Sequence, residues 1–295
     1  MAEIKKILIA NRGEIVQRAI RTIKEMGKKS VAVYSAGDKN ASYLKHADEA
    51  VCIGGAKSSE SYLNIPAIIT AAEMTGCDAI FPGYGFLSEN QDFVEICRLH
   101  NIKFIGPSVE VMEKMADKSK AKEEMIRAGV PVVPGSKGAV HSVTEGKVVA
   151  AEIGYPIMAK AAAGGGGRGM RLIKEESEFD QLFMAASSEA LAAFGDGTMY
   201  LERFINNPRH IEVQVVGDSH GNAIHIGERD CSLQRRHQKV IEESPAILLN
   251  DETRAKLHEV AVKATKYLKY EGAGTFEFLA DDKQNIYFME MNTRL

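Results

Sequence analysis

AAAGGGGRGM, residues 161–170, is the stretch that decides how the fold is interpreted, and it follows an apolar strand pattern ending at Lys160. Glycines expose backbone N–H groups and let the backbone approach a polyphosphate closely. A lysine beside them supplies a point charge for the same phosphates. No Gly-Lys-Ser/Thr follows the glycines, so this is not a Walker loop, and the contiguous run Gly164–Gly167 differs from a dinucleotide fingerprint. The stretch predicts a phosphate-binding loop, with a flexible surface hairpin as the alternative.

Strand and helix patterns alternate in the first part of the chain. The expected strands are Ile4–Ala10, Lys29–Tyr34, Glu49–Ile53, Asp78–Phe81 and Ile102–Ile105, and the expected helices are Glu14–Met26, Asn64–Thr75 and Phe93–His100. Such alternation predicts a parallel, doubly wound sheet in an α/β domain over residues 1–113. Its ligand edge is expected at the carboxyl ends of the strands, where Asn11–Glu14 and Gly83–Gly85 lie.

The pattern changes after Pro107. Residues 114–134 are expected as linker helices, 135–203 as a small unit with the glycine loop, and 204–295 as an antiparallel sheet. The strands expected here are Met170–Ile173, Met199–Phe204, Ile211–Val216, Ala223–Glu228, Gly274–Ala280 and Ile286–Met291, and the helices are Glu145–Ile153, Phe179–Ala193 and Asp251–Tyr267. The predicted fold class is therefore α/β, with α+β character in the second half.

Composition argues against several classes of protein. A net charge of −3 argues against nucleic acid as a partner. No apolar run approaches the roughly 20 residues of a membrane span, so no membrane association is expected. The four cysteines, Cys52, Cys77, Cys97 and Cys231, form no Cys-x-x-Cys pair. Neither a disulfide framework nor a zinc site is expected, and the cytoplasm is the expected compartment.

Two glutamates on expected strands suggest a metal site. Residues i and i+2 of a strand share a face, so Glu290 and Asn292 project together, and Arg294 joins them if the strand stays regular. If the two last strands form a hairpin, Glu277 lies beside Glu290. Two carboxylates and an amide oxygen suit Mg²⁺ or Mn²⁺. Two surface glutamates on a half-solvated sheet are the equally open alternative.

A second polar stretch, ERDCSLQRRHQK at residues 228–239, is interpreted as a charged loop that follows a strand. Such a loop suits an anionic substrate such as a nucleotide phosphate or bicarbonate, and a plain solvated loop is the alternative. His210 and Glu212 share one face of a strand. No Pro-Cys-x-x-Cys follows them, which argues against a zinc deaminase.

Together these motifs resemble the biotin carboxylase family of ATP-grasp enzymes over essentially the whole chain. The motifs that carry the resemblance are IANRGEI (Ile9–Ile15), SYLNIPAII (Ser61–Ile69), PGYGFLSEN (Pro82–Asn90), FIGP (Phe104–Pro107), GGGGRGMR (Gly164–Arg171), NPRHIEVQV (Asn207–Val215), ERDCSLQRRHQKVIEE (Glu228–Glu243), GAGTFEFL (Gly272–Leu279) and EMNTRL (Glu290–Leu295). The resemblance implies a Rossmann-like N-terminal domain, an ATP-grasp lid over residues 135–203 and an ATP-grasp sheet over residues 204–295.

The resemblance also implies a reaction and partners. Bicarbonate attacks the γ-phosphate of ATP, with Mg²⁺ or Mn²⁺ as cofactor, and the resulting carboxyphosphate carboxylates biotin on a carrier protein. The implied partners are a biotin carboxyl carrier protein, a carboxyltransferase component and a second copy in a homodimer. The parent enzyme would be an acetyl-CoA, pyruvate or similar carboxylase, with fatty-acid synthesis favoured. A carbamoyl-phosphate-synthetase-like ligase and a nucleotide-binding module without turnover are the alternatives.

Matched residue by residue, the resemblance assigns roles in three groups. The residues implied to bind ATP are Lys118, Lys160, Gly164, Gly165, Gly166, Gly167, Glu202, Arg203, Ile205, His210, Gln234 and Leu279. Glu277, Glu290 and Asn292 are implied to hold the metal. The residues implied to line the γ-phosphate and bicarbonate pocket as catalytic groups are His237, Lys239, Asn292 and Arg294, and Gly85 is implied to approach the biotin ring.

The family pattern extends beyond Leu295. It continues with Gln-Val-Glu-His-Pro, whose glutamate acts as the base on bicarbonate, and later with an arginine that stabilises the biotin enolate. We therefore expect this sequence to be a C-terminally truncated form, in which nucleotide binding is weak and turnover of biotin is low.

Overall fold

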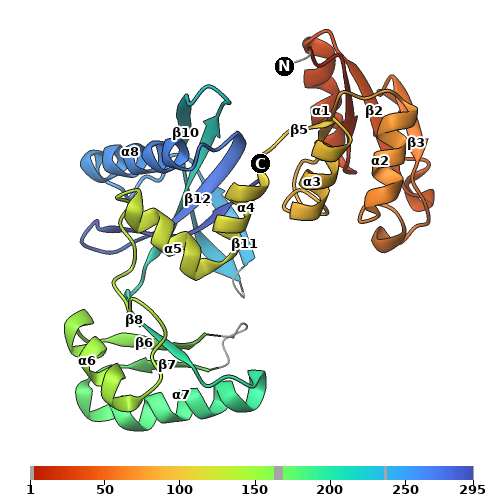
Figure 1. The fold of residues 1–295 in the computed structure, drawn as a ribbon. Coiled ribbons are helices and arrows are strands. Elements are labelled where there is room, and N and C mark those ends of the chain that lie inside the picture. Colours follow the sequence, from red (N-terminus) through yellow and green to blue (C-terminus); the bar gives the residue numbers. More distant parts are fainter. Residues whose placement is uncertain (1–2, 163–168, 236–237, 295) are drawn as a thin grey trace.

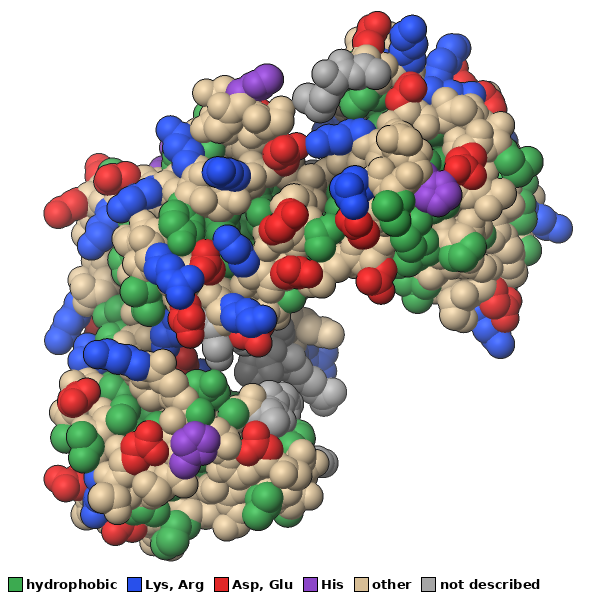
Figure 2. Space-filling model, viewed as in Figure 1, with side chains coloured by type: hydrophobic (Ala, Val, Ile, Leu, Met, Phe, Trp, Pro, Cys, Tyr) green, Lys and Arg blue, Asp and Glu red, His purple; other side chains and the backbone are tan. Residues whose placement is uncertain are grey.

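The structure is a computed structural model that describes residues 3–162, 169–235 and 238–294, except for the side chains of residues 118 and 119. The described residues form three separate β-sheets (Figure 1). A parallel sheet lies at the N-terminal end, a large antiparallel sheet lies in the middle, and a small antiparallel sheet lies at the other end. The space-filling view shows these three lobes arranged around an open concave side (Figure 2).

The N-terminal sheet is parallel throughout and has the strand order β3-β2-β1-β4-β5, as the alternating pattern predicted. Its strands are β1 (Lys6–Ile9), β2 (Lys29–Tyr34), β3 (Glu49–Cys52), β4 (Ala79–Phe81) and β5 (Lys103–Phe104). The helices between them are α1 (Glu14–Glu25), α2 (Ile65–Met74) and α3 (Gln91–Leu99). Asn64 and Asn90 cap α2 and α3 by accepting backbone N–H bonds. Apolar cores on both faces bury the sheet.

The small sheet has the order β7-β6-β8 and is antiparallel. It consists of β6 (Ile157–Ala161), β7 (Met170–Ile173) and β8 (Met199–Arg203), packed against α6 (Val143–Ile153) and α7 (Phe179–Phe194). The stacked rings of Phe179 and Phe183 lie in its core. Strand β6 carries Lys160 and leads toward the glycine run, of which Gly164, Gly165, Gly166 and Gly167 lie outside the described residues.

The large sheet has the order β11-β10-β9-β12-β13. Its strands are β9 (Arg209–Gly217), β10 (Ala223–Arg235), β11 (Gln238–Glu243), β12 (Gly272–Ala280) and β13 (Ile286–Asn292). The helices that contribute to its core are α4 (Val109–Ala116), α5 (Lys118–Arg127) and α8 (Asp251–Tyr267). Alternation along the strands sends apolar side chains such as Val213 and Phe276 into this core and polar ones to the other face.

The interpretation of residues 228–239 as a loop is wrong for the part that the structure describes. Residues 228–235 continue β10, and β11 pairs with β10 through Gln234 opposite Lys239. The polar composition hid this strand because two acids, Glu228 and Asp230, are buried and compensated by arginines. Arg254 pairs with Glu228 at 2.9 Å, and Arg209 pairs with Asp230 at 2.6 Å.

Among the described residues, four hydrophobic cores accompany the three sheets, because the N-terminal sheet has one on each face. Helix α4 joins two of them, because Val111 lies in the core of the large sheet and Met112 in that of the N-terminal sheet. The domain boundaries placed after residues 113, 134 and 203 stay predictions. Among the described residues, no helix combines the length and apolar character needed to span a bilayer.

Candidate functional site

Three glutamates lie side by side on the polar face of the large sheet. The register places Glu277 of β12 opposite Glu212 of β9 on one side and opposite Glu290 of β13 on the other. The prediction that a hairpin places Glu277 beside Glu290 is therefore confirmed. Glu212 was not among the predicted site residues, although its position two residues after His210 already placed it on the same strand face.

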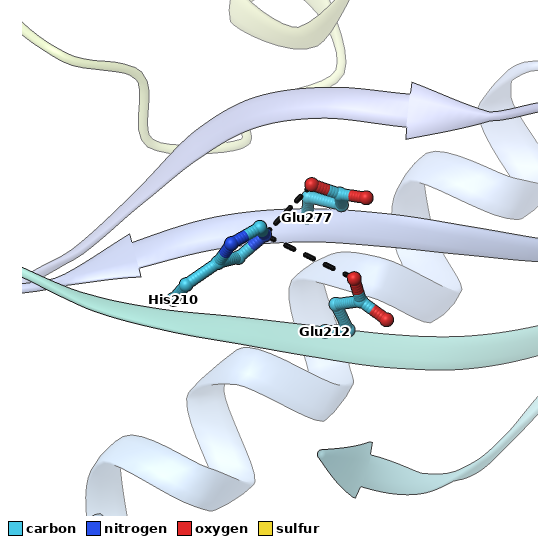
Figure 3. Close-up of side chains that lie close together, drawn as sticks. All are labelled: His210, Glu212 and Glu277. Atoms are coloured by element: carbon cyan, nitrogen blue, oxygen red, sulfur yellow. Dashed lines mark hydrogen bonds and ion pairs between the residues drawn. The ribbon is translucent and has the colours of Figure 1, made fainter. Parts of the chain in front are cut away.

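Nitrogen groups from β9 and β11 contact the central glutamate, Glu277. Nε2 of His210 lies 2.7 Å from Oε2 of Glu277, and Nζ of Lys239 lies 3.0 Å from its Oε1. Lys239 also forms an ion pair with Glu212, and Nε2 of His210 lies 3.9 Å from Oε1 of Glu212. Figure 3 shows His210, Glu212 and Glu277 converging from β9 and β12. This arrangement concentrates negative charge on one face and neutralises it with protein cations.

Glu277 stays ionised although it is buried. Burial would by itself raise its pKa, but hydrogen bonding and charge interactions with His210 and Lys239 lower the pKa to about 2. A buried carboxylate held in this way has its charge fixed at neutral pH. The carboxylate of Glu277 can therefore bind a metal cation, either in place of the ammonium of Lys239 or beside it.

The imidazole of His210 is oriented from its other side. The side-chain amide nitrogen of Gln234, which can only donate, lies 2.7 Å from Nδ1 of His210. Nδ1 is therefore the acceptor, and Nε2 carries the proton that faces Glu277. The same amide nitrogen donates to the carbonyl of Cys231 at 2.9 Å, which anchors Gln234 to its own strand.

The end of β13 continues this network. Asn292 donates from Nδ2 to Oε1 of Glu277 at 2.6 Å, and Arg294 donates from Nη2 to Oδ1 of Asn292 at 3.2 Å. Leu279 stands opposite His210 in the register and so lies beside it on the same face. The predicted residues His210, Gln234, Lys239, Glu277, Glu290, Asn292 and Arg294 thus gather on one face of the sheet or at its edge.

A second cluster lies where the small sheet meets α5. Oε2 of Glu202 lies 2.6 Å from Nζ of Lys160, and its Oε1 lies 3.2 Å from Nζ of Lys122. Burial would by itself raise the pKa of Glu202, but the two ammonium groups lower it below the usual value. The sequence interpretation missed Lys122. Its spacing of four residues from Lys118, one helical turn, is the signal that was available.

The remaining predicted residues lie apart or outside the description. The side chain of Arg203 donates from Nη2 to the carbonyl of Ile153 at 2.8 Å, and its backbone N–H donates to the carbonyl of Pro134 at 2.7 Å. Ile205 is buried just after β8. His237, the four glycines of the loop and the side chain of Lys118 are not among the described groups.

The two loops expected at the ligand edge of the N-terminal sheet meet. Buried Asn11 donates from Nδ2 to the carbonyls of Pro82 at 2.7 Å and Tyr84 at 2.8 Å. Gly83 and Gly85 adopt positive φ angles of 66° and 70°, which glycine tolerates best. Gly85 is exposed, so its backbone is accessible to a ligand.

Two family models match the chain. Residues 3–112 match the biotin carboxylase N-terminal domain, and residues 117–295 match the ATP-binding domain of the carbamoyl-phosphate synthase L chain. Biotin carboxylase of Nostoc sp. (strain PCC 7120) is 57% identical over 290 residues, which cover 98% of this chain and 65% of that protein. Biotin carboxylase 1 of Bacillus subtilis is 52% identical over 293 residues, which cover 99% of this chain and 65% of that protein.

Solved structures of biotin carboxylases are also similar to this chain. A biotin carboxylase–β,γ-ATP complex from Campylobacter jejuni has a TM-score of 0.85 and 69% identity over 99% of this chain and 66% of that one. The biotin carboxylase domain of a thermophilic 2-oxoglutarate carboxylase bound to bicarbonate has a TM-score of 0.92 and 49% identity over 100% and 64%. This chain thus spans slightly less than two thirds of the length of these relatives. With an N-terminal parallel sheet and an ATP-grasp portion that match along its whole length, the chain belongs to the biotin carboxylase family of ATP-grasp proteins.

Proposed function

We propose that the protein carries out, or forms the nucleotide-binding part of, the biotin carboxylase reaction. An oxygen of bicarbonate attacks the γ-phosphorus of ATP and ADP leaves, which yields carboxyphosphate. Transfer of its carboxyl group to N1′ of biotin then releases inorganic phosphate. The single observation that carries this proposal is the polar face around Glu277, where His210, Lys239 and Asn292 all contact one buried carboxylate.

ATP is proposed to lie between the small sheet and the polar face of the large one. Lys160 would contact its phosphates, with Lys118 beside it and Gly164, Gly165, Gly166 and Gly167 closing over them. Glu202, the backbone at Arg203 and Ile205, and the side chain of Leu279 would surround the adenine, and His210 and Gln234 would lie by the ribose and phosphates. The Campylobacter relative, solved as a β,γ-ATP complex, supports a nucleotide in this fold.

A divalent cation fits the donor set on β12 and β13. Glu277, Glu290 and Asn292 offer carboxylate and amide oxygens, the ligands preferred by Mg²⁺ and Mn²⁺. The ammonium of Lys239 already bridges Glu212 and Glu277, so this position accepts positive charge. When bound, the ion would neutralise charge on the phosphate oxygens.

The chain's own residues would position and neutralise the reactants. Lys239 and Arg294, with His237, are proposed to line the pocket for bicarbonate and the γ-phosphate, because cationic side chains stabilise the charge of a transferring phosphoryl group. The side-chain amide of Asn292 would connect Arg294 to Glu277, because it accepts a hydrogen bond from Arg294 and donates one to Glu277. Gly85, held by the loop that Asn11 binds, would approach the biotin ring.

Biotin on a separate carrier protein, a carboxyltransferase component and a second copy of the chain are the proposed partners. The second copy is supported by the structure of a related biotin carboxylase domain, which is a dimer in complex with MgADP, ADP and bicarbonate. Each of the four cysteines lies within the described residues as a free thiol, which supports the cytoplasm as the proposed compartment.

The test is release of ADP from MgATP with and without bicarbonate and free biotin, with biotin carboxylase 1 of Bacillus subtilis as the positive control. Bicarbonate-dependent release that biotin stimulates is the expected result. Nucleotide binding without release would identify a binding module instead. Release that ammonia stimulates and biotin does not would favour a carbamoyl-phosphate-synthetase-like ligase and overturn the proposal.

A further inference from the structure

Within the part of the chain that the structure describes, Glu202 has two cationic partners, and they come from different parts of the fold. Lys160 belongs to β6, which pairs with β8 within the small sheet, whereas Lys122 belongs to α5. Ala121 and Met125 of α5 are buried in the core of the large sheet. The Lys122–Glu202 ion pair therefore joins the body of the large sheet to the small one.

The connecting segment is built to keep this contact close. Gly135 forms a bridge to Glu202, and a Cβ atom there would meet the carbonyl oxygen of Leu201 at 2.7 Å and Nζ of Lys122 at 3.0 Å. Glycine is thus the residue that lets the chain pass between β8 and α5. Figure 1 shows this stretch running from α5 toward β8.

The charge of Glu202 gives a reason for the presence of both Lys122 and Lys160. Glu202 and Lys122 each have side chains only 25% exposed, and the carboxylate is held ionised by both ammonium groups. If Lys160 turns to the phosphates of a nucleotide, Glu202 loses its shorter ion pair, of 2.6 Å. A largely buried carboxylate left without a cation is strongly unfavourable. With Lys122 in place, the carboxylate keeps one cationic partner throughout.

We propose that Lys122 is a positioning residue for nucleotide binding: it holds the charge of Glu202 so that Lys160 is free to pair with the phosphates. This inference rests on the proposed function, because it takes Lys160 as a phosphate contact. Lys122 acts through Glu202 and does not itself touch the nucleotide. It therefore sets the affinity for ATP, and its effect depends on the carboxylate.

The test is a double-mutant cycle on nucleotide affinity, measured by isothermal titration calorimetry with MgATP. Lys122→Met is expected to weaken binding about tenfold, which corresponds to about 1.4 kcal/mol. In a Glu202→Gln background, which has no carboxylate to neutralise, the same substitution is expected to change the affinity less than about twofold. Lys120→Met, on an exposed lysine of the same helix, is the matched control and should bind as the parent does.

The outcomes separate the possibilities. An equal loss in both backgrounds would mean that Lys122 contacts the nucleotide or only supports the fold, and would overturn the inference. Unchanged affinity in Lys122→Met would overturn it as well, while leaving the proposed function intact. Absence of ATP binding by the parent chain would overturn both. Lys122→Arg, which keeps the charge, should restore binding to within about twofold if the methionine variant fails to fold.

Discussion

Glu89 accepts two hydrogen bonds from Thr293, one from its backbone N–H at 3.0 Å and one from its hydroxyl at 3.1 Å. Glu89 belongs to the PGYGFLSEN motif of the N-terminal domain, and Thr293 follows Asn292 at the end of β13. Nε of Arg294 also lies 3.9 Å from Glu89. The two motifs that carry the proposed biotin and metal contacts are therefore linked directly, although they lie 204 residues apart in the chain.

Removing this link should loosen the end of β13. In Glu89→Ala both accepted hydrogen bonds are lost, which we expect to lower the free energy of unfolding by about 1–2 kcal/mol. The amide of Thr293 should exchange its hydrogen at least about tenfold faster, because it loses its acceptor. Hydrogen exchange, measured by mass spectrometry on peptides that contain Thr293, tests this expectation. Glu95→Ala, which removes an exposed partner of Arg98 within α3, is the control and should leave exchange at Thr293 unchanged. Equal exchange in all three proteins would contradict the assigned role of Glu89.

The metal proposal predicts that Glu290→Gln weakens Mg²⁺-dependent nucleotide binding. The substitution removes one negative charge from the row formed by Glu212, Glu277 and Glu290 while keeping the shape of the side chain. We expect the Mg²⁺ concentration at half-saturation to rise about tenfold, because hard cations depend on carboxylate charge. Binding measured in EDTA should not fall. Asp282→Asn, in the turn between β12 and β13, provides the control. An unchanged Mg²⁺ titration would refute the assignment.

The depressed pKa of Glu277 makes stability depend on pH on the acid side. Its folded pKa of about 2 lies below the ordinary value of 4.5. The unfolded chain therefore binds the proton first, and the stabilisation is fully present above about pH 5 and is lost as the pH falls toward 2. Urea unfolding at about pH 6 and about pH 3 should show a larger loss for the parent than for Glu277→Gln. Equal losses in both proteins would show that the His210 and Lys239 contacts do not stabilise the carboxylate.

Local patterns in the sequence predicted much of the fold. The structure has α8 at residues 251–267 and β7 at 170–173, the ranges expected from periodicity and turn residues. The pairing of Glu277 with Glu290 could also be predicted, because a short turn joins their strands. Contacts between distant segments could not. Lys122 and Glu202 are 80 residues apart, and neither residue signals its partner. The polar composition of residues 228–235 predicts a loop, because buried acids on a strand are recognisable only once their arginine partners are known.

One of those buried acids supports a prediction away from the proposed site. The side chain of Glu228 is 2% exposed and lies 2.9 Å from Nε of Arg254 and 2.6 Å from Nε2 of His258. Burial would by itself raise its pKa, but these partners lower the pKa below the ordinary value. Removing one partner of a buried charge typically costs several kcal/mol.

Arg254→Met should therefore lower the free energy of unfolding by about 3 kcal/mol. Affinity for MgATP should stay within about twofold of the parent value, because Glu228 stands opposite Val213 on the face that packs against α8. Urea unfolding and calorimetry measure the two quantities, with Lys256→Met on the same helix as the control. A stable variant would show that the ion pair is dispensable. A stable fold with lost nucleotide binding would instead connect this network to the polar face, which the strand alternation on β10 argues against.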